Sequence, residues 1–168
     1  MSFSNRVSQT LHEEHRATIA LMEELESFIR RHHRAIPNIS DGLVSQFIAR
    51  LGTSIEAEIE RHFDFEERHL FSYLKAIGDA EIGAHLTEEH VAMRPLGRRL
   101  AAIARSARTA NFDEPSWREF QGLGQEFCER MLAHVQKEEM ALLPILEESM
   151  DSNTEAALYQ AYVEERTG

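Results

Sequence analysis

HFDFEERHL (residues 62–70) and HVQKEEMAL (residues 134–142) share one pattern, in which a histidine is followed four residues later by a pair of glutamates. Both stretches lie in long segments with the composition of helices, and residues four apart lie on the same face of a helix. Each copy therefore places an imidazole nitrogen beside a carboxylate. Such a pair, supplied twice, offers ligands suited to two transition-metal ions.

Around these copies, the few glycines and prolines separate long segments rich in helix-forming residues, and no stretch shows the alternation of a β-strand. We expect helices over about residues 5–33, 41–77, 79–109 and 115–150, with a short final helix over about 153–166. Short connections between long amphipathic helices favour an all-α, antiparallel up-down four-helix bundle. Residues 1–168 are predicted to form a single domain.

Local signals refine these boundaries. Asp41 or Ser40 can cap the second helix, and the final helix is expected to begin near Asn153. Pro95 lies inside the third helix and Pro144 inside the fourth, where a proline cannot donate its backbone hydrogen bond. We expect a kink or local loosening at both prolines.

The chain also repeats itself. LHEEHRA (residues 11–17) in the first helix resembles LTEEHVA (residues 86–92) in the third, at an offset of 75 residues. The two histidine–glutamate copies in the second and fourth helices have an offset of 72 residues. The nearly equal offsets indicate duplicated helix pairs, which in a bundle predicts pseudo-twofold symmetry.

Six side chains from the four helices lie on the apolar stripes that face the predicted core. A single histidine on such a stripe is more often a hydrogen-bonded core residue than a ligand, but two buried carboxylates without cations would each cost several kcal/mol. Metal ions remove that cost. The predicted metal ligands are His15, His62, Glu66, His90, His134 and Glu138.

Other acidic residues and histidines near these positions are harder to assign. Glu67 and Glu139 fall off the inward face and are expected to be solvated or salt-bridged. The double glutamates at 13–14 and 88–89 are expected mainly as surface charge. His12 flanks the stripe of the first helix, where either a role beside the metal site or none is compatible with the pattern.

Beyond Glu66, His69 lies one turn further along the same stripe, followed by Tyr73. Either residue could be an additional ligand or could support the ligands, although the counterpart of His69 in the second copy is an alanine. Glu58 and Arg130 occupy equivalent positions one turn before the two copies. We hypothesise that they form an inward-facing ion pair beneath the metals.

Composition limits the classes of partner. The net charge of −11 argues against nucleic acid and anionic membranes. No apolar run is long enough to cross a bilayer and no signal peptide is evident, while the single Cys128 cannot form an internal disulfide. A cytoplasmic protein with a small-molecule partner is expected, and no oligomeric state is predicted.

The sequence resembles the hemerythrin-like (HHE cation-binding) family over roughly residues 10–147. The resemblance rests on His15, His62-x-x-x-Glu66, His90 and His134-x-x-x-Glu138. It implies a four-helix bundle holding a non-haem di-iron centre, in which both glutamates bridge the irons and an oxo or hydroxo group completes the bridge. Manganese or zinc are the expected substitutes for iron.

Details of the pattern separate it from two other groups of proteins. Oxygen-carrying hemerythrins have a His-x-x-x-His pair on the third helix, but Leu86 and Arg94 lie four residues either side of His90. The chain is closer to the four-His, two-Glu members, which include iron-centre repair proteins. Ferritin-like bundles need the Glu-x-x-His element twice, and only Glu66-x-x-His69 provides it.

Three functions are compatible with such a site. The first is binding or sensing of O2, peroxide or NO, and the second is a di-iron enzyme that decomposes peroxide or acts as an oxidase. The third is an iron-sensing or iron-donating module. A helical bundle with adventitious metal ranks last, and the sequence does not decide between an enzyme and a binding protein.

Overall fold

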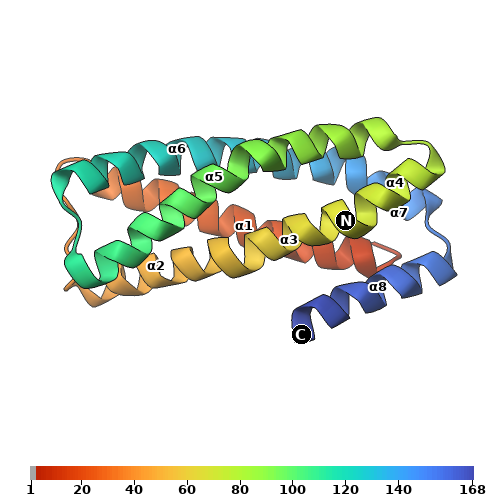
Figure 1. Cartoon of the computed structure of the whole chain (residues 1–168), viewed down its shortest axis with the longest axis horizontal. Helices are drawn as coiled ribbons and strands as arrows, with labels where there is room; N and C mark the ends of the chain where they lie inside the picture. The colour runs from red at the N-terminus through yellow and green to blue at the C-terminus, as the bar shows by residue number, and fades with distance from the viewer. Residues whose placement is uncertain (1–2) are drawn as a thin grey trace.

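The computed structural model describes residues 3–168 as four antiparallel helical rods and an additional C-terminal helix (Figure 1), so the predicted all-α bundle is confirmed. The elements are α1 (Arg6–Arg31); a second rod of α2 (Gly42–Thr53), η1 (Ser54–Ile59), α3 (Glu60–Phe65), η2 (Glu66–Leu70) and α4 (Phe71–Ile77); α5 (Ala80–Ala110); a fourth rod of α6 (Glu114–Lys137), η3 (Glu138–Leu142) and α7 (Leu143–Ser149); and α8 (Ser152–Thr167). None of the described helices is both long enough and apolar enough to span a membrane.

Short polar residues and one glycine fix where the rods begin and end. Of the two candidate caps of α2, Asp41 is used. Gly78 ends α4 in the left-handed region, with φ 96°, which glycine adopts without a steric penalty. The expected start of the final helix at Asn153 is slightly late, because the side chain of Asp151 accepts the amide of Thr154 and α8 begins at residue 152.

The two internal prolines have different outcomes. α5 continues as one α-helix across Pro95, so the proline does not interrupt this helix. Before Pro144 the helix is distorted, as η3 has the wider π-helical hydrogen-bond pattern. Pro144 has no amide hydrogen to donate to the carbonyl of Met140, which removes one α-helical bond at this point.

Two of the π-helical segments begin at equivalent glutamates. The amide of Phe71 donates to the carbonyl of Glu66, and the amide of Leu143 donates to the carbonyl of Glu138, each across five residues. The extra residue in each turn locally changes the direction of the side chains, and such turns are frequent at functional sites. The sequence periodicity did not indicate them.

A layer of polar side chains divides the hydrophobic core in two. The larger cluster includes Met22, Phe63 and Met93, and the smaller includes Leu11 and Leu70. Each rod contributes one or two buried polar residues near the boundary between the two clusters. The buried histidines and glutamates therefore form a slab across the bundle, with apolar packing on both sides.

α8 packs outside the four rods, along the first part of α1 (Figure 1). It has no fully buried residue. Arg6 forms an ion pair with Glu155 at 2.8 Å and lies over the ring of Tyr159, while Tyr162 meets the edge of Phe65. α8 is therefore attached to the bundle mainly by polar and aromatic contacts, and not by side chains buried in the core.

Candidate metal centre

The polar slab brings together all six predicted ligand residues, and each rod contributes at least one. Five of them are 0–1% exposed, and only the His62 side chain is more accessible, at 11%. They are His15 of α1, His62 of α3, Glu66 of η2, His90 of α5, His134 of α6 and Glu138 of η3.

The ligand atoms form two groups that share both glutamates. His15 and His62 belong to one group and His90 and His134 to the other, and within a group all atoms lie within 4.8 Å of one another. In every histidine Nε2 faces the carboxylates. His15 Nε2 lies 2.8 Å from Glu138 Oε2, His62 Nε2 lies 2.9 Å from Glu66 Oε1, His90 Nε2 lies 3.3 Å from Glu66 Oε2, and His134 Nε2 lies 2.7 Å from Glu138 Oε1.

The carboxylates at the centre have the chemistry of a cation site. Both oxygens of Glu66 and both of Glu138 are buried without a hydrogen-bond partner, as is Nε2 of His15, because the close contacts lack hydrogen-bond directions. Leaving four such oxygens unsatisfied in a protein interior is costly. Imidazole and carboxylate donors around them suit divalent transition metals, so the residues fit the metal centre that the fold implies.

The opposite ring nitrogen of each histidine points outward to a second carboxylate. The Nδ1 pairs are His15 with Glu139 at 2.6 Å, His62 with Glu14 at 2.7 Å, His90 with Glu67 at 2.8 Å and His134 with Glu89 at 2.7 Å. An Nδ1–H that donates to a carboxylate fixes the ring orientation and leaves the Nε2 lone pair for a metal. All four rings are held in the same way.

The sequence model of the Hemerythrin HHE cation binding domain matches residues 6–146, which contain every residue of both groups. The chain belongs to this family. The same model matches again over residues 84–167, beginning in the second helix pair. A search of curated proteins found no match. Family membership and the two His/Glu groups together support a metal-binding, hemerythrin-like protein.

The outer carboxylates of this HHE domain correct the sequence interpretation. Glu14 and Glu89 were expected mainly as surface charge, and Glu67 and Glu139 as solvated or salt-bridged residues, but each is partly buried against a histidine of a neighbouring rod. Their positions obey the repeat. In the second and fourth rods, the second glutamate of each pair, Glu67 or Glu139, contacts the histidine of another rod. In the first and third rods, the glutamate directly before the histidine, Glu14 or Glu89, does the same. Recurrence of double glutamates in all four helices was the available signal.

Each outer carboxylate also has a further partner, and these differ between the halves. Lys137 pairs with Glu89, Arg94 Nη2 lies 3.2 Å from Glu67, and His12 Nδ1 lies 2.8 Å from Glu139. Glu14 is contacted by Tyr162, whose hydroxyl donates to Oε1 at 2.6 Å, and by Arg166. Thus α8 supports one carboxylate of the HHE domain, while the four-rod bundle supports the other three.

Two other predicted site residues, His69 and Tyr73, lie outside the ligand groups. His69 Nε2 contacts Glu165 of α8 at 2.8 Å, and the hydroxyl of Tyr73 donates to Ser149, so both join α8 and α7 to the second rod instead of joining either ligand group.

The hypothesised ion pair between Glu58 and Arg130 is wrong. Glu58 is exposed, and Arg130 pairs with Glu126 on its own helix at 3.0 Å. Both positions are one turn from the copies as predicted, but they point to the bundle surface, where a charged head group remains hydrated at little cost.

In the metal-free HHE domain, protons can compensate the buried carboxylates. Burial lowers the pKa of His62, but the charges of Glu66 and Glu138 outweigh it and raise the pKa to about 10. Burial likewise lowers the pKa of His134, and Glu138 raises it to about 9. Burial and Glu138 raise the pKa of Glu66, yet the facing histidines hold it below its usual value. Metal ions and protons therefore compete for the same Nε2 atoms.

Proposed function

We propose that this HHE domain holds two iron ions at the two ligand groups. His15 and His62 would hold one ion, His90 and His134 would hold the other, and Glu66 and Glu138 are placed to contribute to both groups. The observation that carries the proposal is the sharing of both unpartnered carboxylates between two pairs of inward-facing Nε2 atoms. A single ion would leave one pair of imidazoles without a role.

Each ion would have two nitrogen and two oxygen donors from the protein, a set that suits iron and also accommodates manganese or zinc. Four donors leave room for solvent or a small molecule on an ion of higher coordination number. When bound, a di-iron centre supplies redox chemistry and a binding position for O2, peroxide or NO. We propose binding or sensing of such molecules as the function.

This chain's own residues prepare the site for that function. The outer carboxylates hold all four imidazoles in one tautomer and increase their basicity, which favours tight metal binding. Burial on both sides by apolar clusters keeps large substrates and bulk water away from the ligands. A small ligand is therefore the class that the enclosed site can admit.

The test is the optical spectrum of the iron-loaded protein, recorded after reduction and again with NO, and in the oxidised form with and without peroxide. We expect new absorption bands on addition of NO or peroxide, and their loss in His134→Ala. An iron-loaded protein whose spectrum is unchanged by O2, NO and peroxide would contradict the proposed function.

A di-iron enzyme that breaks down peroxide is the second candidate, because the partly exposed edge of His62 gives small oxidants access to the same residues. It would release O2 from peroxide over many turnovers, and a binding protein would not. Iron donation is disfavoured because five of the six ligands are almost completely enclosed. Transfer of iron to a metal-free acceptor within minutes would reverse that ranking.

A further inference from the structure

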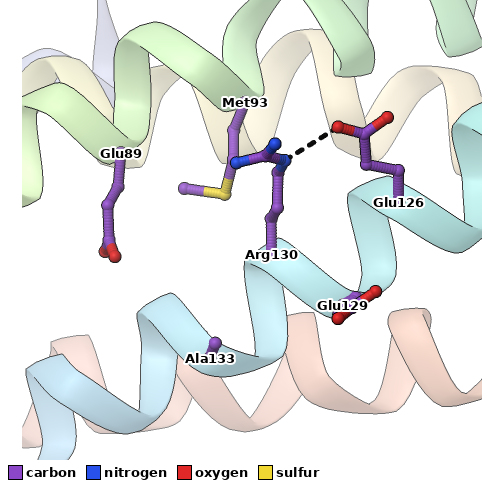
Figure 2. Close-up of a pocket in the computed structure, with 6 residues that line it drawn as sticks. All are labelled: Glu89, Met93, Glu126, Glu129, Arg130 and Ala133. Carbon is purple, nitrogen blue, oxygen red and sulfur yellow. Dashed lines mark hydrogen bonds and ion pairs between the residues drawn. The ribbon is translucent and has the colours of Figure 1, made fainter.

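Two surface cavities beside the ligand groups are related by the internal repeat. The first, of about 330 Å³, is lined by residues of α1, η1, α3 and α8, and the second, of about 490 Å³, lies between α5 and α6 (Figure 2). Thr18 in the first corresponds to Met93 in the second, and Glu58 corresponds to Arg130, by the same offsets of 75 and 72 residues. Differences between the cavities therefore show how the two halves diverge.

The second cavity is separated from the ligands. The side chain of Met93 lies in the space between the helices, and Arg130 extends from α6 toward α5 beside it (Figure 2). Met93 and His134 are both 1% exposed, and His134 does not line the cavity. A molecule in this cavity meets a thioether and a guanidinium before any ligand.

The first cavity reaches a ligand directly. His62, the most accessible of the six residues, forms part of its lining. Thr18 has a much shorter side chain than Met93 and leaves the space beside the imidazole open. Tyr162 and Arg166 of α8 form the opposite wall and contact Glu14, the carboxylate that holds His62.

The charges of the first cavity select among small molecules. Glu13, Glu14 and Glu58 contribute three carboxylates, against the guanidinium of Arg166 and, in the metal-free protein, the protonated imidazole of His62. Such an excess of negative charge lowers the local concentration of anions, and salt screens it only partly over these short distances. Uncharged molecules are unaffected.

We propose that the cavity beside Thr18 and His62 is the entrance through which uncharged small ligands reach the metal centre, and that Met93 closes the equivalent position in the second half. That small ligands bind at the end of this route rests on the proposed metal centre. The position of the entrance and its preference for uncharged molecules rest on the cavity alone.

The first experiment introduces the methionine of the second cavity at the equivalent position of the first cavity. In the iron-loaded, reduced protein, Thr18→Met is expected to slow NO binding by about tenfold, equal to about 1.4 kcal/mol in the barrier. Ala133→Leu, which adds more bulk to the second cavity than Thr18→Met adds to the first, should leave the rate unchanged. Equal rates in Thr18→Met and the unchanged protein, at equal iron content, would overturn the proposal.

The second experiment needs no metal. In Thr18→Cys, the introduced thiol is expected to react faster with uncharged methyl methanethiosulfonate than with the anionic sulfonatoethyl analogue. The ratio of these two rates should be about tenfold larger than the same ratio for a small thiol free in solution. Glu58→Gln should reduce that difference. Native Cys128 does not interfere, because it is fully buried and burial raises its pKa to about 12.

The outcomes separate the two proposals. A protein that binds no metal but shows the charge preference at residue 18 contradicts the proposed function and leaves the cavity assignment standing. If iron-loaded protein binds NO at the full rate after residue 18 has been blocked, the proposed entrance is contradicted but the proposed metal centre is not. Equal reaction of residue 18 with both reagents contradicts the charge preference.

Discussion

At the scale of single residues, the two ring nitrogens of each histidine have separate tasks. Nε2 faces the shared carboxylates, and Nδ1 is held by a carboxylate from another rod. The inner positions could be predicted from the sequence because an apolar stripe marks the inward face. The periodicity of the outer glutamates did not reveal their role, since a residue that reaches across to a neighbouring helix has the periodicity of a surface residue; only the recurrence of double glutamates indicated it.

Removing one outer carboxylate should weaken metal binding without unfolding the protein. In Glu89→Gln, the charge that stabilises the Nδ1–H of His134 is lost, and we expect metal affinity to fall by about 10–100-fold. Competition with a chelator measures it. Glu88→Gln alters the exposed neighbouring glutamate on the same helix and should have no effect; an equal loss in both variants would rule out a specific role for Glu89.

The metal-free protein should lose stability as the pH rises. The pKa values of His62 and His134 are raised from 6.5 to about 10 and about 9, so the folded state binds more protons than the unfolded state between these limits. Their contribution is complete below pH 6.5 and disappears as the pH passes 9–10. Lowered pKa values of Glu66 and Glu138 give the opposite loss as the pH falls below 4.5.

The free energy of unfolding of the metal-free protein can be measured by urea unfolding in excess chelator across this pH range. We expect the highest stability between about pH 4.5 and 6.5. The metal-loaded protein is the control, because deprotonation of the same histidines strengthens metal binding and stability should rise with pH. Constant stability of the metal-free protein from pH 6.5 to 10 would show that these histidines do not hold the protons.

At the scale of elements, long rods were predictable from composition and capping residues, whereas two features were not. The π-helical turns that begin at Glu66 and Glu138 have no signature in the sequence, since one extra residue per turn hardly alters the apolar pattern. The docking of α8 was also unpredictable. It depends on individual contacts, such as that between Tyr162 and Glu14, that no periodicity encodes.

The contact between α8 and the metal centre can be tested with a pair of tyrosines. Tyr162→Phe removes only the hydroxyl that donates to Glu14, and we expect it to destabilise the protein by about 1 kcal/mol. The spectrum of the iron-loaded form should also shift, because His62 loses part of its support. Tyr159→Phe, whose ring lies under Arg6, should leave the spectrum unchanged. Identical spectra for both variants would show that α8 does not influence the centre.

At the scale of the whole molecule, duplication explains both what the halves share and where they differ. The ligands and outer carboxylates follow the repeat, so two similar helix pairs predicted the symmetric cluster. Thr18 and Met93, or Glu58 and Arg130, occupy equivalent positions with different chemistry. Glu58 and Arg130 were expected to interact, but equivalence under a pseudo-twofold axis places them in separate cavities.

The buried slab connects folding to metal binding across the bundle. It separates two apolar clusters and contains four carboxylate oxygens that lack hydrogen-bond partners in the described residues. Metal bound there stabilises the folded state only, because the unfolded chain does not assemble the site. The number of ions per chain is consequently the quantity that decides whether the slab is a metal centre.

Metal analysis of freshly purified protein, compared with His134→Ala and Glu138→Gln, is the most direct test. The geometry predicts two ions per chain, predominantly iron, because both glutamates are shared by two pairs of histidines. The variants should hold about one ion or fewer. A chain that purifies without metal and takes up neither iron, manganese nor zinc, or variants that hold as much metal as the unsubstituted protein, would contradict the proposed centre.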